Sequence, residues 1–278
     1  MIEVRDLQVR YGTRVVARVP ELDVGAGECV AIVGESGSGK STTLLSLLGL
    51  TEGADVSGHV SVCGVEVLQA SPQQLRRIRG ARVALVLQSP QAALSPTTRL
   101  GTLMRRALEL HGITGPRGGG PETGGPETGG SAGSRKERSW KGRASKGGLE
   151  RVMVEAVEAV MLDPEILRRY PHEISGGQAQ RFAIALAIAL GAEVILADEP
   201  TSALDVTVQA EVVGVLHGLR EERGLALLIV SHDLALVSTI ADRVLVMKDG
   251  EVVESGPAAD VLTRPSHPYT RELLEALP

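Results

Sequence analysis

The chain has 278 residues, of which 43% are hydrophobic and 23% charged, and its formal net charge is −5. This is the composition of an ordinary globular protein with enough length for a large core, and the negative charge argues against a nucleic-acid partner. The longest uncharged apolar stretch, Phe182–Ala192, reaches about half the length that a bilayer span needs, so we expect no membrane crossing. The N-terminus alternates like a strand and lacks a signal-peptide pattern, so we do not expect export.

Two cysteines, Cys29 and Cys63, each lie in an apolar stretch with strand character. We therefore predict small buried thiols and a reducing compartment. No cluster of histidines and cysteines has the spacing of a metal site.

The first part of the chain alternates between apolar and polar residues, as half-buried strands do. The pattern predicts strands over Ile2–Arg10 and Val15–Val24 with a turn at Gly12–Thr13, followed by a hairpin-like pair over Val56–Val67 broken at Gly64. This opening is antiparallel in character.

Three later apolar runs, Ala81–Leu87, Glu193–Asp198 and Leu225–Ser231, are nearly continuous. Because helical stretches separate them, they predict a parallel sheet that is covered on both faces. The helices predicted around these runs are Gln73–Arg79, Leu100–His111, Glu150–Met161, Gly177–Leu190 and Val206–Glu222.

The end of the chain has a strong hairpin signal. An Asp249-Gly250 turn joins predicted strands over Arg243–Met247 and Glu251–Ser255. A last helix is expected near Thr270–Leu277.

Residues 112–149 differ in composition from the rest. They hold more than a third of the chain's 33 glycines, a tandem PETGG repeat and almost no large apolar side chains. Such a segment cannot bury enough apolar surface to fold alone, which predicts a disordered insertion. Its basic run around Trp140 leaves open a contact with anionic lipid headgroups or a partner.

Residues 34–41 form a complete phosphate-binding P-loop between an apolar strand, Glu28–Val33, and a helix predicted over Thr42–Leu50. Its glycines permit backbone angles that turn N–H groups inward around phosphates. Lys40 supplies positive charge to the β- and γ-phosphates, and the Ser41 hydroxyl can ligate Mg²⁺. The nucleotide-binding residues predicted here are Gly34, Glu35, Ser36, Gly37, Ser38, Gly39, Lys40, Ser41 and Thr42.

A second motif places two carboxylates, Asp198 and Glu199, at the end of an apolar strand. Asp198 is predicted to hold Mg²⁺ together with Ser41, as the corresponding acid of P-loop NTPases does. Glu199 is the predicted catalytic base, or polarises the water that attacks the γ-phosphate.

The third motif, Ile174-Ser175-Gly176-Gly177-Gln178, stands directly before a long apolar helix, where it can form a second anion site. With this motif the chain resembles the ATP-binding subunits of ABC transporters, whose signature is close to LSGGQ; Ile174 replaces the usual leucine. The resemblance covers the whole chain except 112–149, and both nucleotide motifs are intact, which argues against a non-hydrolysing subunit.

The resemblance implies roles for four more residues. Gln88 matches the family's Q-loop glutamine, which senses Mg²⁺ and the γ-phosphate, and His232 matches the switch histidine that contacts the γ-phosphate. Asp205 matches the D-loop, which connects two sites, and Tyr11 stands where the family stacks an aromatic ring on adenine. The family also implies a head-to-tail dimer in which Ser175, Gly176, Gly177 and Gln178 cover the ATP of the opposing subunit.

Other stretches are similar to the peptide and nickel importers of the family. These are the segment from Gln88 to Pro96, the Tyr170-Pro171-His172-Glu173 run, and the C-terminal His267-Pro268-Tyr269-Thr270-Arg271. Ser89 departs from the acidic residue that often follows the glutamine. Peptide, nickel or another small solute stays open.

Together these features predict one ABC ATP-binding domain over residues 1–278. It is an α/β fold with a RecA-like P-loop NTPase core, an antiparallel β subdomain and a helical subdomain at about 89–173. The resemblance implies ATP and Mg²⁺ as cofactors, a second ATPase subunit, identical or different, and a peripheral place on the cytoplasmic membrane face. Permease subunits and an extracytoplasmic solute-binding protein would complete an importer. The alternatives are a subunit of a soluble enzyme complex, such as carbon–phosphorus lyase, and a soluble ABC protein acting on DNA or ribosomes.

Overall fold

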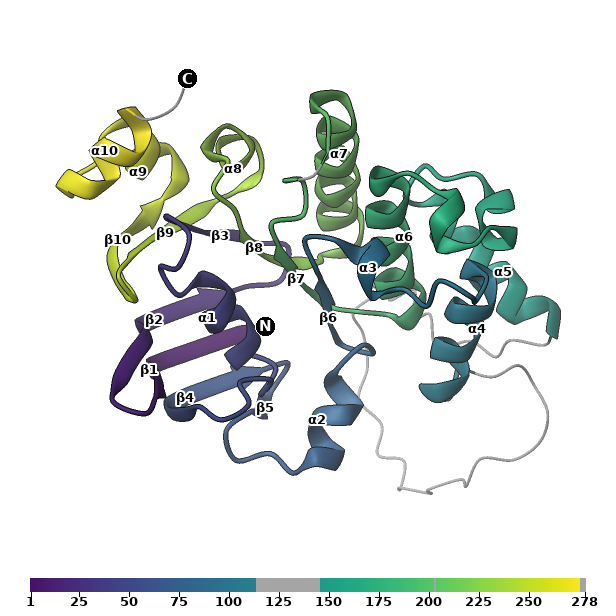
Figure 1. Ribbon diagram of the computed structural model, residues 1–278, viewed down its shortest axis with the longest axis horizontal. Coiled ribbons are helices and arrows are strands. Elements are labelled where there is room, and N and C mark those ends of the chain that lie inside the picture. Colours follow the sequence, from purple (N-terminus) through teal and green to yellow (C-terminus); the bar gives the residue numbers. More distant parts are fainter. Residues whose placement is uncertain (114–145, 203, 276–278) are drawn as a thin grey trace, which may run out of the picture.

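One ten-stranded sheet runs through the molecule (Figure 1). The computed structural model describes residues 1–113, 146–202 and 204–275, so most of the insertion predicted at 112–149 lies outside the described residues. In spatial order the strands are β5 (Val65–Glu66), β4 (Asp55–Val62), β1 (Ile2–Tyr11), β2 (Arg14–Val24), β10 (Glu251–Pro257), β9 (Arg243–Lys248), β3 (Cys29–Val33), β8 (Ala226–Val230), β7 (Val194–Asp198) and β6 (Val83–Val86).

The sheet changes character along its width. β5, β4, β1 and β2 pair antiparallel, whereas β9, β3, β8, β7 and β6 pair parallel. The sequence patterns predicted the antiparallel opening and the parallel pairing of β6, β7 and β8. β10 joins the halves, because it pairs antiparallel with β9 and parallel with β2. The α/β fold with a P-loop core and an antiparallel extension is thus confirmed.

Helices cover both faces of the parallel part and gather beyond β6 (Figure 1). The helices are α1 (Lys40–Ser46), α2 (Pro72–Ile78), α3 (Pro90–Ala93), α4 (Leu100–Leu110), α5 (Lys146–Glu158), α6 (Gly176–Leu190), α7 (Val206–Arg223), α8 (Leu234–Ile240), α9 (Ala258–Thr263) and α10 (Pro268–Glu275), with short 3₁₀ turns η1 (Pro164–Arg168) and η2 (Pro171–Glu173). We call α3 to α6 with η1 and η2 the helical region.

Two hydrophobic cores lie on opposite faces of the sheet. In β3, Cys29, Ala31 and Val33 face one core, and Val30 and Ile32 face the other, because successive strand residues point to opposite faces. Both predicted thiols are buried. Burial of both faces fixes the parallel strands, and with them the loops at their carboxyl ends.

Several boundaries differ from the prediction. α5 begins at Lys146, inside the range predicted for the insertion, and α10 begins at Pro268, because a proline fits the first helical turn. α3, α8 and α9 were not predicted, since helices of four to seven residues give only a weak periodic signal. Among the described residues, none of the helices combines the length and apolar character that a bilayer span requires.

Candidate nucleotide site

The P-loop connects β3 to α1, and its glycines are required by close backbone contacts. Gly34 has φ +147°, and a Cβ there would lie 2.1 Å from the Met247 carbonyl oxygen. Gly39 has φ +96°, and its Cβ would lie 2.4 Å from the Val16 carbonyl oxygen. Both positions therefore exclude any side chain. The loop is packed between β9 and β2, which holds its shape.

Lys40 begins α1, and only 6% of it is exposed. Its Nζ donates hydrogen bonds to the Gly34 carbonyl at 2.8 Å and the Glu35 carbonyl at 2.6 Å. Burial lowers the pKa of Lys40, while the carboxylates of Glu199, Asp198 and Glu35 oppose that shift. The ammonium group is thus aimed by the backbone of its own loop.

The predicted catalytic and sensing residues meet at one edge of the parallel sheet. Gln88 follows β6, Glu199 follows β7 and His232 follows β8, and the carboxyl ends of adjacent parallel strands share an edge. The Nε2 of Gln88 donates to Glu199 Oε2 at 3.2 Å, and His232 Nδ1 lies 3.0 Å from Glu199 Oε1. Glu199 has a left-handed φ of +46°, a strained conformation for a residue with a side chain. Its carboxylate is therefore held from two sides.

Oxygen ligands for a divalent cation lie next to this cluster. The Ser41 Oγ donates to Asp198 Oδ1 at 3.1 Å. Burial raises the pKa of Asp198, and Glu199 adds to that rise, whereas the Ser41 hydrogen bond and Lys40 lower it. Gln88 donates through Nε2, which leaves its Oε1 free to accept. Hydroxyl, carboxylate and amide oxygens form the hard donor set that Mg²⁺ prefers. Within the described ranges, no group of three or more His, Cys, Asp or Glu side chains is placed to hold a metal.

These residues surround a cavity of about 290 Å³. It is lined by Val16, Ser36, Gly37, Gly39, Lys40, Ser41, Thr42, Gln88, Asp198 and Glu199. Val16 is the lining residue that the sequence did not reveal, since an apolar residue in a strand carries no signal of its own. Tyr11 lies outside this lining, at the β1–β2 turn, and is 42% exposed. Its stacking on adenine stays a prediction.

The signature residues lie outside this cavity. Ser175 caps α6, accepting from the Gln178 N–H at 3.2 Å, while the Gln178 side chain accepts from the Ser175 N–H at 3.1 Å. A Cβ on Gly177 would lie 2.2 Å from Val208 Cγ1, so this glycine lets α6 approach α7. A Cβ on Gly176 would meet Leu204 at an ordinary 3.6 Å, and Gly176 and Ser175 are exposed. Their outward surface has room for another molecule.

The D-loop residue Asp205 also serves the fold, because its carboxylate accepts from the Val208 N–H at 3.1 Å and caps α7. Ala203 of the same loop lies outside the described residues. Asp205 is exposed and, like the signature, does not line the cavity. The chain therefore brings together the P-loop, Gln88, Asp198, Glu199 and His232, but not the signature residues or Asp205.

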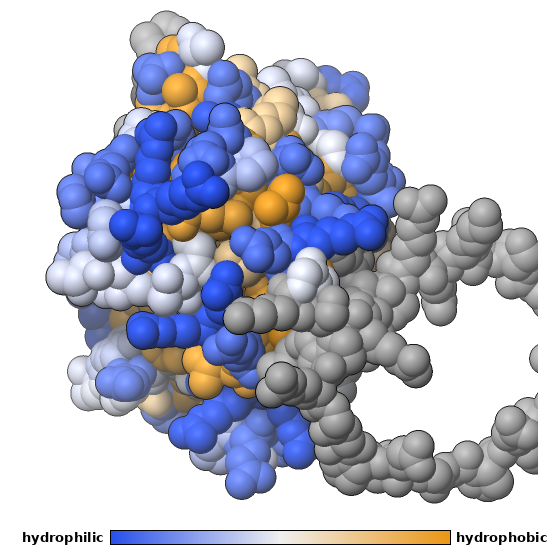
Figure 2. All heavy atoms as spheres, turned by 90° about the vertical axis from the view of Figure 1, so that its right-hand side faces the viewer, coloured by the Kyte–Doolittle hydropathy of each residue, from blue (hydrophilic) through white to orange (hydrophobic). Residues whose placement is uncertain are grey.

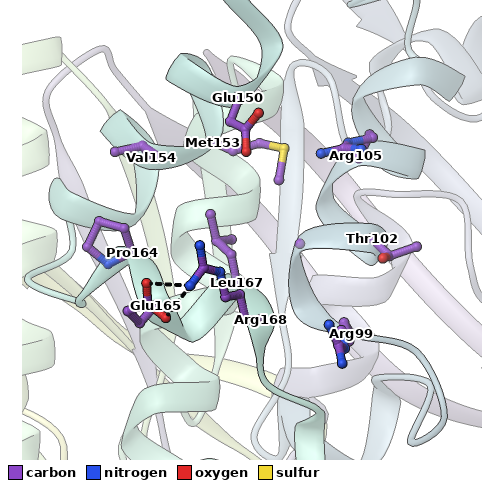
Figure 3. Close-up of a pocket in the computed structure, with 11 residues that line it drawn as sticks. Arg99, Thr102, Arg105, Glu150, Met153, Val154, Pro164, Glu165, Leu167 and Arg168 are labelled. Carbon is purple, nitrogen blue, oxygen red and sulfur yellow. Dashed lines mark hydrogen bonds and ion pairs between the residues drawn. The ribbon is translucent and has the colours of Figure 1, made fainter. Parts of the chain in front are cut away.

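A second cavity, of about 320 Å³, lies in the helical region between α4, α5 and η1 (Figure 3). Arg99, Arg105 and Arg168 line it together with two glutamates. Arg168 pairs with Glu165 at 2.9 Å. Because three arginines face two glutamates, the lining carries a net positive charge. Figure 2 shows this end of the molecule, where hydrophobic patches lie between hydrophilic residues.

A parallel sheet with a glycine P-loop, a buried lysine and paired carboxylates at its edge defines a P-loop NTPase. Comparison with known families agrees, since the sequence profile of the ABC transporter family matches residues 18–202. The chain belongs to this family as an ATP-binding ATPase.

Relatives described as ATP-binding proteins of transporters match nearly the full chain and support the assignment. A probable peptide ABC transporter ATP-binding protein of Sinorhizobium fredii, y4tR, is 36% identical across 100% of this chain and 77% of its own length. A putative peptide import ATP-binding protein of Brucella ovis is 39% identical, across 100% of this chain and 78% of its own. A probable D,D-dipeptide transport ATP-binding protein of Escherichia coli, DdpD, is 40% identical, across 92% and 71%.

The fold also matches solved structures. The ATP-binding cassette MJ0796, in a dimeric post-hydrolysis state with ADP and Pi, has a TM-score of 0.71 and 26% identity. The match covers 93% of this chain and 99% of that one. The cbiO1 protein of Clostridium perfringens has the same TM-score at 21% identity, which shows the fold alone.

Proposed function

We propose that this chain is the ATPase subunit of an importer for peptides or dipeptides. The observation that carries the proposal is its match, over the full chain, to relatives named as peptide import ATP-binding proteins. These names favour peptides over nickel. The solute does not bind this subunit, so its identity belongs to the proteins that assemble with it.

In this proposal the cavity at the P-loop holds the phosphates of ATP. Lys40 and the N–H groups of residues 36–42 would bind the phosphate oxygens, as in other P-loop proteins. Ser41, Asp198 and the Oε1 of Gln88 would hold Mg²⁺, which neutralises charge on the phosphates when bound. Tyr11 would stack on the adenine.

Glu199 is the proposed catalytic base. Its two oxygens already face two partners, Gln88 and His232, so it cannot rotate freely, and this fixes where a water could give up its proton. His232 is proposed to contact the γ-phosphate and to keep Glu199 oriented.

The proposed partner in hydrolysis is a second cassette, either another copy of this chain or a related one. Ser175, Gly176, Gly177 and Gln178 would cover the nucleotide of that partner, and Asp205 would link the two sites. The dimeric relative with ADP and Pi supports this arrangement. ATP that binds the closed pair more tightly than the open one would drive closure.

Hydrogen bonds connect the segment after Gln88 with the segment before the signature residues in this chain. Gln91, three residues after Gln88, donates from Nε2 to the carbonyls of Pro171 at 2.8 Å and Ile174 at 3.1 Å. A shift of Gln88 toward the cation would therefore also displace Ile174, the residue directly before Ser175. We propose that permease subunits dock on the helical region near the arginine-lined cavity, at the cytoplasmic face, and that an extracytoplasmic binding protein delivers the peptide.

The test is a pull-down of the tagged chain from gently solubilised native membranes, with partners identified by mass spectrometry. Two permeases with a second cassette would support the importer. The binding protein that accompanies them would then be screened against peptides and against nickel. Recovery with soluble enzymes alone, such as lyase subunits, would overturn the transport role and leave the ATPase in place.

A further inference from the structure

The C-terminal segment contacts the P-loop directly. The Glu35 N–H donates a hydrogen bond to the Tyr269 hydroxyl at 3.0 Å, across 234 positions of sequence. Tyr269 belongs to α10 and is 3% exposed, so this hydroxyl lies inside the molecule and not on its surface. The contact is with the backbone, so it requires no particular side chain at position 35.

The peptide unit that joins Gly34 to Glu35 links this tyrosine to the P-loop lysine. Its N–H, on Glu35, donates to the Tyr269 hydroxyl, and its carbonyl, on Gly34, accepts from Lys40 Nζ at 2.8 Å. A short chain of hydrogen bonds therefore runs from the tyrosine hydroxyl through one peptide to the ammonium group. Such chains polarise and orient their members together.

Tyr269 is itself held in place from two sides. The Lys248 ammonium, at the end of β9, lies 4.4 Å from the centre of the tyrosine ring. The His267 Nδ1 accepts from the Tyr269 N–H at 3.2 Å. The ring therefore sits between the end of β9 and the start of its own helix.

A carboxylate on β10 fixes the segment that leads into α10. Glu254 Oε1 accepts from the N–H and the Oγ of Ser266, both at 2.7 Å, and Glu254 Oε2 accepts from the His267 N–H at 3.1 Å. Burial of Glu254 opposes ionisation, but the nearby Thr270 hydroxyl and the bonds from Ser266 and His267 lower its pKa to about 2. The anchor is charged at neutral pH.

We propose that Tyr269 is a positioning residue for ATP, which sets the Glu35 peptide and thereby aims Lys40. The C-terminal segment, anchored on Glu254, then acts as a brace on the phosphate site. This inference rests on the proposed role of Lys40 in binding phosphate. It predicts that nucleotide affinity depends on a residue that does not touch the nucleotide.

The test compares Tyr269→Phe with Arg264→Ala in the full chain. Phenylalanine keeps the ring and removes the hydroxyl, while Arg264 forms only an exposed pair with Asp260 beside the same segment. Loss of one hydrogen bond predicts a roughly threefold to tenfold rise in the Kd and KM for ATP, with kcat within about twofold of wild type. Arg264→Ala should match wild type in all three.

Amide hydrogen exchange gives a local readout that does not need activity. Tyr269→Phe should speed exchange at the Glu35 amide and leave β7 unchanged, because only the loop loses its partner. If Tyr269→Phe binds ATP as wild type does and the Glu35 amide exchanges at the same rate, the brace is excluded. A wild-type chain that fails to bind ATP at all would instead refute the proposed site.

Discussion

The P-loop edge and the signature loop are both predicted to bind phosphate, but their side chains are surrounded by partners to different degrees. At the P-loop edge, the segments after four strands supply a lysine, two carboxylates, a glutamine and a histidine. Each of them is already held: the lysine by its own loop, Asp198 by Ser41, and Glu199 by the glutamine and the histidine. At the signature loop, Ser175 and Gln178 bond only within their own helix cap, and Gly176 faces outward. One region encloses a cavity, and we propose that the other completes a site only with a second molecule.

The difference follows from what each region must bury. Residues at the carboxyl ends of β3, β6, β7 and β8 are fixed by a sheet that is buried on both faces. The signature loop is fixed on one side, where Gly177 packs against Val208 and Gln91 binds the Ile174 carbonyl, and its other side stays exposed. A surface that is rigid, capped and uncovered suits contact with a second molecule.

The largest expected effect lies at the P-loop edge. Glu199→Gln keeps the hydrogen-bonding shape but removes the base, so ATP hydrolysis should fall about 10²- to 10⁴-fold while ATP still binds. Steady-state phosphate release and equilibrium ATP binding check both parts. Turnover near the wild-type rate would remove Glu199 from catalysis.

The P-loop glycines separate packing from conformational strain. Gly34→Ala places a methyl group 2.1 Å from the Met247 carbonyl, whereas Gly37→Ala meets nothing within 4 Å and suffers only from its φ of +84°. We expect unfolding free energy to fall by about 3 kcal/mol or more for Gly34→Ala and about 1 kcal/mol for Gly37→Ala. Denaturant titration measures the order, and equal losses would show that β9 does not support the loop.

Substitutions of the two signature glycines should have different effects on folding stability and on association with a partner. Gly177→Ala must push against Val208 and should cost about 1–3 kcal/mol of stability, while Gly176→Ala should stay within about 0.5 kcal/mol of wild type. The Gly176 variant should instead weaken ATP-dependent association. If Gly176→Ala destabilises the fold but associates normally, the surface that contacts the partner lies elsewhere.

The smallest effect is a pH dependence at the anchor of the C-terminal segment. In the folded protein the pKa of Glu254 is about 2, below the ordinary value of about 4.3. The ionised carboxylate therefore stabilises the fold fully above about pH 4.3, and this stabilisation is lost as the pH falls toward 2. Melting temperature should therefore drop more steeply over this range in wild type than in Glu254→Gln. Parallel curves would show that the carboxylate adds nothing.

The sequence alone was sufficient to predict those site residues that stand at a fixed place after an apolar strand. The P-loop, Asp198, Glu199 and Gln88 each stand directly after an apolar run, and parallel strands bring those positions to one edge. The Tyr269–Glu35 contact joins residues 234 positions apart, and no local pattern announces it. The need for glycine at position 177 likewise comes from Val208 on another helix, which only the packed structure reveals.

We propose that a second cassette completes the nucleotide site of this chain. Sedimentation of Glu199→Gln with ATP, alone and mixed with any cassette recovered from membranes, is the measurement that decides it. We expect an ATP-dependent shift from monomer to dimer that Gly176→Arg abolishes. A monomer in both samples, with the wild-type chain hydrolysing ATP at a rate per chain that does not change with concentration, would contradict it.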